Sequence, residues 1–146
     1  MKNMFRESQF NGDISNWNVS KVTDMYGMFY GSHFNNDISK WDVSNVTDMV
    51  HMFENSPFNK DISSWNISNV IYMKGMFNYC ESLTLLHDIS KWNISNIINM
   101  RYLFSGCISL ISLSDILKLN ISNVIDIHSM LDGNINCFNI IPKLLK

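Results

Sequence analysis

The stretch FNNDISKWDVSNVTDMVHMF, residues 34–53, decides the fold, because the chain repeats it along most of its length. One copy begins upstream at Phe10 and another begins downstream at Phe58. Two more divergent copies run through Asp88 and Asp115. Internal repetition of this kind is typical of architectures in which each repeat is one supersecondary unit and neighbouring units share a core.

The tryptophans measure the period of the repeat. Trp17, Trp41 and Trp65 follow one another at intervals of 24 residues, and Trp92 follows Trp65 after 27. This regularity predicts one repeat domain over residues 1–130, with about five coils of which the first is incomplete. After Met130 the register is lost, and residues 131–146 are predicted to form a C-terminal cap over the last coil or a frayed tail.

Each coil carries two apolar patterns that predict its local structure. The D-I-S-x-W-x-V part is short and β-branched, which favours a strand paired in parallel with the same stretch of the next coil. The V-x-x-M-x-x-M-F part has the spacing of one helix face and predicts a short helical turn around 48–54, with a second strand as the alternative. The expected fold class is therefore an α/β repeat solenoid with short parallel strands and a helical turn in each repeat of 24–27 residues. In one coil the apolar positions are Phe34, Ile38, Trp41, Val43, Val46, Met49, Met52 and Phe53.

Composition and charge narrow the class of protein. Hydrophobic residues make up 46% of the chain and charged residues 16%, which predicts a folded chain. A net charge of −2 gives no electrostatic bias towards nucleic acid, so no nucleic-acid partner is predicted. No apolar run approaches the roughly 18 residues of a membrane helix, so no transmembrane segment is expected. The sequence MKNMFRESQF at the N-terminus resembles neither a signal peptide nor a lipobox, and cellular location is not predicted.

An aspartate recurs at one position of every coil. Turn-capping is the favoured role, because each turn leaves backbone groups that a carboxylate can accept from. Calcium binding is the alternative, but the glycine turns that accompany calcium-binding aspartates in β-rolls are missing here. No metal and no cofactor is therefore predicted. The column consists of Asp13, Asp37, Asp61, Asp88 and Asp115.

No catalytic residue can be assigned from the sequence. The four histidines occupy four different columns, and neither a G-x-S-x-G elbow nor a phosphate-binding glycine loop occurs. Cys80 and Cys107 lie one repeat apart and are predicted to be reduced, buried thiols. The chain is therefore expected not to be an enzyme.

The two longer coils carry a family resemblance. They read F-N-Y-C-E-S-L from Phe77 and F-S-G-C-I-S-L from Phe104. The combined pattern N-V-x-x-M-x-x-M-F-x-x-C-x-x-L, followed by D-I-S-x-W, resembles the BspA-type leucine-rich repeat over about residues 4–130. The variant found in mycoplasma lipoproteins of unknown function and in large DNA viruses is the most similar. The resemblance implies a right-handed, leucine-rich-repeat-like coil, often at the cell surface and acting in adhesion.

The surface positions whose residue differs from repeat to repeat are the candidates for contacting a binding partner. Stacking would bring together Tyr72, Lys74, Arg101 and Tyr102, and tyrosine and arginine are enriched at interface hot spots. We therefore expect a non-enzymatic scaffold that binds an unidentified protein through a stacked face. The alternative is a surface or envelope piece, structural or adhesive, that works by self-association. Its support is an incomplete, uncapped N-terminal coil, which leaves an apolar end.

Overall fold

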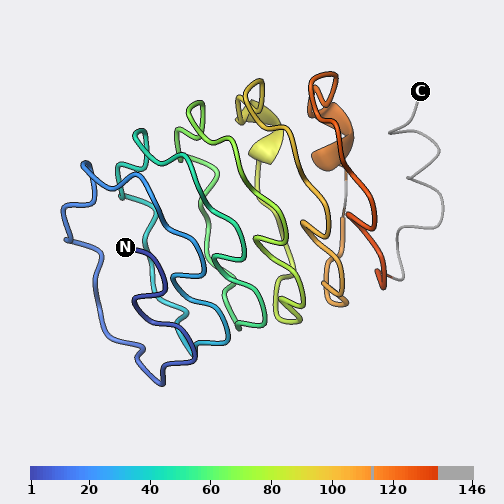
Figure 1. Cartoon of the computed structure of the whole chain (residues 1–146). Coiled ribbons are helices and arrows are strands. Elements are labelled where there is room, and N and C mark those ends of the chain that lie inside the picture. The colour runs from blue at the N-terminus through green and yellow to red at the C-terminus, as the bar shows by residue number, and fades with distance from the viewer. Residues whose placement is uncertain (113, 135–146) are drawn as a thin grey trace.

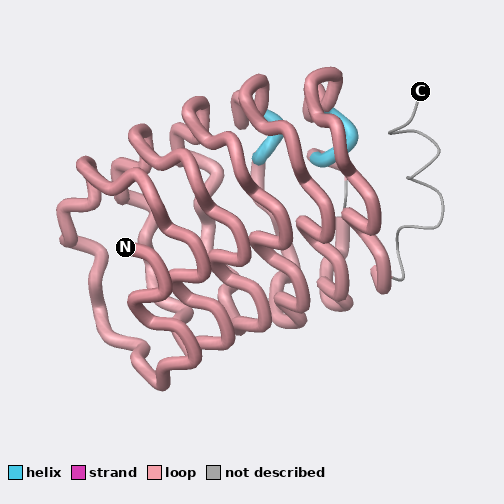
Figure 2. The backbone as a smooth tube through the Cα atoms, viewed as in Figure 1, coloured by secondary structure: helices cyan, strands magenta, loops and turns pink. Residues whose placement is uncertain are grey.

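The computed structural model describes residues 1–112 and 114–134. Within these residues the regular elements are two 3-10 helices, η1 (Ile89–Lys91) and η2 (Ile116–Lys118), while the rest is turns, bends and irregular chain. Figure 2 shows this predominance of loop. The prediction of an α/β repeat solenoid is therefore wrong, since neither a strand, a sheet nor an α-helix occurs in the described chain. Isolated parallel bridges join Asp24 to Asp48, Asp48 to Tyr72, Tyr72 to Asn99, and Asn99 to Asp126.

The predicted helical turn is replaced by consecutive tight turns. The N–H of Met28 donates to the carbonyl of Met25 at 3.2 Å, and the N–H of Ser32 donates to that of Phe29 at 3.1 Å. Gly27 lies between the first pair with a φ of 55°. A left-handed residue interrupts a right-handed helix. The apolar spacing of three thus comes from turns closed between residues i and i+3.

The predicted strand also bends too sharply to pair along its length. In the D-I-S-x-W segment the N–H of Trp41 donates to the carbonyl of Ile38 at 3.1 Å. The N–H of Ser39 donates to the Asp37 carboxylate at 2.8 Å. Both bonds are local, so the backbone groups that would pair with a neighbouring strand are used within the turn. The elements η1 and η2 occupy the same place in later repeats.

Successive repeats lie side by side and are joined by backbone hydrogen bonds. The N–H of Gly27 donates to the carbonyl of Val50 at 2.9 Å, and that of Phe29 donates to the carbonyl of Met52 at 2.8 Å. Figure 1 shows the turns of the chain following one another from the N-terminal end. We call this arrangement the stack. Its repeats 1 to 4 are residues 10–33, 34–57, 58–84 and 85–111, and the described part of repeat 5 is residue 112 and residues 114–134. Residues 1–9 match the second half of a repeat.

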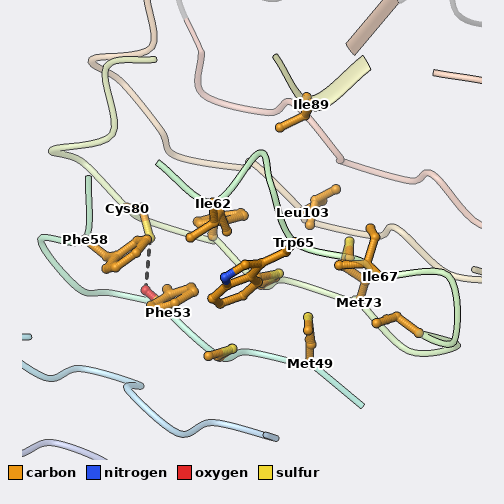
Figure 3. Packing of buried hydrophobic residues seen from close by; sticks show 14 of the residues in the cluster. Met49, Phe53, Phe58, Ile62, Trp65, Ile67, Met73, Cys80, Ile89 and Leu103 are labelled. Atoms are coloured by element: carbon orange, nitrogen blue, oxygen red, sulfur yellow. Dashed lines mark hydrogen bonds between the residues drawn. The ribbon is translucent and has the colours of Figure 1, made fainter. Parts of the chain in front are cut away.

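A ladder of phenylalanines runs through the core of the stack. The ring centroids of Phe29 and Phe53, of Phe53 and Phe77, and of Phe77 and Phe104 are each 5.6 Å apart, with nearly parallel planes. Figure 3 shows Phe53 within this core, beside Phe58 and Trp65. The eight apolar positions that recur in the repeat are all buried in repeat 2, which confirms the predicted core. They are Phe34, Ile38, Trp41, Val43, Val46, Met49, Met52 and Phe53.

An asparagine in each of four repeats binds the backbone of the repeat before it. The amide of Asn45 donates to the carbonyl of Ser20 at 2.8 Å, and the amide of Asn69 donates to that of Ser44 at 2.7 Å. Asn96 and Asn123 make the same bond to Ser68 and Ser95. These side chains therefore connect turns that have few backbone partners of their own.

The predicted C-terminal cap or tail, residues 131–146, falls largely outside the described residues, which end at 134. Within 131–134 the repeat pattern continues, because Leu131 is buried and the amide of Asn134 donates to the carbonyl of Phe104 at 2.8 Å.

Candidate partner-binding face

The residues predicted to bind a partner lie on the two adjacent repeats 3 and 4. We call Tyr72, Lys74, Arg101 and Tyr102 the binding face. The N–H of Gly75 donates to the carbonyl of Arg101 at 2.9 Å, which sets the turns of Lys74 and Arg101 side by side. Tyr72 is 48% exposed, and the other three are partly buried. The structure thus sets Lys74 and Arg101 in neighbouring turns and links Arg101 to Tyr102, while Tyr72 lies two residues before Lys74.

Tyr102 holds the guanidinium of Arg101 in place. Nη2 of Arg101 donates to the Tyr102 hydroxyl at 2.8 Å, and Cζ lies 4.8 Å from the Tyr102 ring centroid. The Tyr102 backbone is left-handed, with a φ of 58°, and its ring meets His128 edge-on at 6.4 Å. The arginine is therefore oriented by an uncharged partner; the Tyr102 hydroxyl and the charge of Asp126 raise the pKa of Arg101, although no carboxylate of the described chain forms an ion pair with it.

The two cations of the binding face differ from Lys91 and Lys118, but resemble Lys2, Lys21, Lys40 and Lys60, in having no ion pair among the described residues. Lys91 and Lys118 pair with aspartates three residues earlier, at 2.8 Å and 2.7 Å. Within the described chain, neither Lys74 nor Arg101 lies within 4.0 Å of a carboxylate. Sequence reasoning named these residues but missed that they lack acidic partners. Comparison of equivalent positions between repeats would have revealed it.

The predicted tryptophan column is buried in three repeats and exposed in one. Trp41, Trp65 and Trp92 are buried, whereas Trp17 is 40% exposed and packs against Phe5 at 5.8 Å. The indole N–H groups of Trp41 and Trp65 donate to main-chain carbonyls of the preceding repeat, each at 3.1 Å. That of Trp92 has no acceptor among the described residues. Trp41, Trp65 and Trp92 are therefore core residues, whereas Trp17 lies partly at the surface.

The aspartate column divides into two local structures. In repeats 1 to 3 the carboxylates accept from the backbone N–H of the serine two residues later, at 2.8–2.9 Å. In repeats 4 and 5 they pair with lysines at η1 and η2. The backbone N–H of Ser15 lowers the pKa of Asp13. Burial raises the pKa of Asp61, but the hydrogen bonds from Ser63 outweigh it and the net shift is downward. The column consists of Asp13, Asp37, Asp61, Asp88 and Asp115.

Metal ligands do not cluster in the part of the chain that the structure describes. No group of three or more His, Cys, Asp or Glu side chains there is placed to hold a metal ion.

His51 belongs to a network of side-chain contacts that the sequence did not suggest. His51 Nδ1 contacts the Glu54 carboxylate, whose other oxygen accepts from the Asn78 amide at 3.0 Å.

A family model links the chain to known sequences. The model of a Mycoplasma protein of unknown function, DUF285, matches residues 1–110 and 82–141. The chain belongs to the DUF285 family. This fits the mycoplasma part of the resemblance seen in the sequence, but the BspA-type leucine-rich-repeat assignment is not confirmed. Neither the curated proteins nor the solved structures contain a match to this DUF285 chain.

Cys80 and Cys107 of this DUF285 protein are buried in the stack. The thiol of Cys80 donates to the carbonyl of Phe53 at 2.9 Å, as the dashed line in Figure 3 marks. Burial raises the pKa of the Cys80 thiol well above its usual range, which disfavours the nucleophilic thiolate. Cys80 therefore has the properties of a core residue.

Helices able to cross a membrane are missing from residues 1–112 and 114–134 of the DUF285 protein, since none there is both long and apolar enough.

Proposed function

We propose that this DUF285 protein is a non-enzymatic binding protein that recognises a protein partner through the binding face. The observation that supports this is variation of side chains over a constant backbone. The carbonyls of Lys74, Arg101 and His128 accept from the N–H of the residue that follows the equivalent position one repeat earlier, at 2.9–3.2 Å. Only peptide groups take part, so the fold leaves the choice of side chain open. The equivalent positions hold Tyr26, Val50, Lys74, Arg101 and His128.

The buried neighbours of these positions vary far less. Met25, Met49, Met73 and Met100 directly precede the variable positions, and all four are buried. Packing thus explains the repeated methionine, whereas it does not explain why Lys74 and Arg101 appear where Tyr26 and Val50 stand. Tyrosine and arginine are the residue types that most often dominate the energy of protein interfaces. The proposal assigns no catalytic residue.

Site-specific photo-crosslinking tests the proposal. A benzophenone amino acid replaces Tyr72, and the matched control places it at Lys40, an exposed residue of repeat 2. In extracts of the cells that make the protein, we expect a discrete crosslinked product from position 72, reduced by Arg101→Ala and absent from position 40. Equal products from both positions, or none from position 72, would count against a partner at this face.

Self-association as a surface or envelope piece is the second candidate. The observation that favours it is exposed apolar surface near the N-terminal end, where Met4 is 51% and Trp17 is 40% exposed. Such surface promotes association when it is contiguous. Light scattering over a concentration series checks it: we expect a mass that rises with concentration and falls back in Trp17→Ser. A constant monomer mass at high concentration would exclude this candidate.

A further inference from the structure

The charges around the binding face follow a pattern along the stack. Two columns of side chains flank Lys74 and Arg101: the residue two positions before each and the residue four positions after each. In repeats 2 and 5 both columns are acidic, whereas in repeats 3 and 4 both are uncharged. The first column reads Asp48, Tyr72, Asn99 and Asp126 from repeat 2 to repeat 5, and the second reads Glu54, Asn78, Ser105 and Asp132.

This pattern creates a confined cationic site. Neither Lys74 nor Arg101 forms an ion pair within its own repeat, and the neighbouring repeats 2 and 5 along the stack carry acidic side chains in both columns. Potentials from clustered charges of one sign attract ligands of the opposite sign. The border limits the site to two positive charges, because a longer run of negative charge on a ligand would meet the acidic repeats 2 and 5.

Arg101 is arranged to receive an anion. One of its N–H groups is used by the Tyr102 hydroxyl, and Nε is covered and finds no acceptor among the described residues. The remaining amino N–H groups have no carboxylate within the described chain to bind. Carboxylates and phosphates are the groups that a guanidinium fork binds most strongly. Because Tyr102 already orients the side chain, less conformational freedom is lost on binding.

The spacing of the repeats selects the form of the ligand. The rings of Phe77 and Phe104, three residues after Lys74 and Arg101, are 5.6 Å apart, which is the separation of equivalent core side chains in repeats 3 and 4. An α-helix advances about 5.4 Å per turn, and side chains at i and i+4 lie about 5–6 Å apart. An extended strand presents successive side chains on one face about 6.6–6.8 Å apart. The spacing of the helix is therefore closer than that of the strand to the 5.6 Å between repeats 3 and 4.

We propose that the binding face receives an acidic α-helix of a partner protein. The helix lies along the stack axis and places two carboxylates, one turn apart, against Lys74 and Arg101. Tyr72 and Tyr79, 48% and 54% exposed, contact the apolar side chains beside those carboxylates. This inference rests on the proposed function and specifies the partner's chemistry.

Fluorescence anisotropy with designed peptides tests the match. The probe is a labelled, alanine-based helical peptide with two glutamates four residues apart and leucines beside them. The matched control has the same composition but places the glutamates two residues apart, where they do not share a face. We expect the full chain to bind the first peptide about fivefold or more tightly than the second, since one carboxylate is then lost from the interface.

Variants of the protein locate the binding. Lys74→Glu and Arg101→Glu should each lower the affinity for the first peptide by about tenfold or more, because a pair of like charges replaces a pair of opposite charges. Lys40→Glu, at an exposed lysine of repeat 2, is the control and should leave binding unchanged. Thermal melts verify that each variant is folded. If Arg101→Glu is unfolded, Arg101→Gln is measured in its place.

Three outcomes would overturn the inference. Equal affinity for the two glutamate spacings would refute the helical match. Equally tight, Lys74-dependent binding of a single-stranded oligonucleotide would show a general anion site. If neither peptide binds at millimolar concentration while the position-72 crosslink persists, the partner class is wrong but the proposed function stands. If the position-72 crosslink is lost as well, both the inferred helical partner and the proposed function are refuted.

Discussion

The imidazole of His51 lies over Gly75, the residue at the same position one repeat later. A Cβ added to Gly75 would be 2.7 Å from Nδ1 of His51 and 3.0 Å from Cε1. Both residues are left-handed, with φ values of 55° and 59°. A large side chain at this position therefore restricts the following repeat to a small one. The same relationship joins Asn3 to Gly27, and at a second left-handed position Glu7 to Gly31 and Tyr79 to Gly106.

Gly75→Ala should destabilise the protein by about 2 kcal/mol, because about 1 kcal/mol of left-handed strain adds to the clash with His51. His51→Gly removes the clash but leaves the strain. The double variant should therefore lose less stability than the sum of the single variants, by about 0.5 kcal/mol or more. Urea unfolding of the four proteins measures this coupling, and simple additivity would show that the two side chains do not compete for space.

Trp65→Ala should lower the free energy of unfolding by about 3–5 kcal/mol, the range for truncating a buried tryptophan. The ring is 3% exposed and its N–H is bonded to the Ile38 carbonyl. Trp17→Ala is the matched control and should cost markedly less, because Trp17 is 40% exposed. Chemical denaturation followed by circular dichroism compares them. A similar loss in both would mean that burial does not set the contribution of this column.

Asp61→Ala should cost about 1 kcal/mol, as for loss of a capping side chain, because the Ser63 N–H loses its acceptor. Asp61→Asn retains an acceptor oxygen and should change stability by less than about 0.5 kcal/mol. We expect the same Tm in chelator and in millimolar calcium. A calcium-dependent rise in Tm that Asp61→Asn abolishes would instead make the aspartate column a metal site.

Asp48→Asn should stabilise the protein slightly at neutral pH. Burial raises the pKa of Asp48 above its unfolded value, so ionisation of this carboxyl disfavours the folded state as pH rises through the folded pKa. Asparagine keeps the acceptor for the Val50 N–H, as Asn99 does for Arg101. Thermal melts should show a Tm increase of at most about 3 °C at pH 7. The increase should vanish below about pH 4, where the wild-type carboxyl is protonated in both states. A difference independent of pH would refute this explanation.

The sequence predicted which residues are buried but not the path of the backbone. A spacing of three apolar residues arises both on a helix face and in consecutive turns. Left-handed residues distinguish the two, and glycine is their usual signal. Gly27 and Gly75 do mark the position, but His51 and Tyr102 occupy it in other repeats and conceal the pattern. The tight D-I-S turns were hidden for a related reason, since β-branched residues are also typical of strands.

The candidate site was predicted in part. Stacking of equal repeats is enough to place Lys74 beside Arg101, and the period alone supplies that. The bond between Arg101 and Tyr102 depends on the left-handed backbone of Tyr102, which the sequence does not reveal. Exposure of Trp17 could not be inferred from the repeat either, because equivalent positions suggest equal burial. The Ile14 carbonyl accepts a hydrogen bond from the indole N–H of Trp41, and no described residue does the same for Trp17.

Hydrogen bonds between peptide groups join the turns of Lys74 and Arg101 to the preceding repeats, so under the proposed function the residues that bind a partner are distinct from those that hold the backbone. Substitutions at these two positions can accumulate without prior stabilising changes, because neither side chain supports the backbone. Met73 and Met100, one residue earlier, are buried and tolerate little drift. We therefore expect the residues at these two positions to diverge faster within the family than the buried residues beside them. Duplication of a repeat would copy one variable surface position together with the buried methionine and the hydrogen-bonded turn beside it.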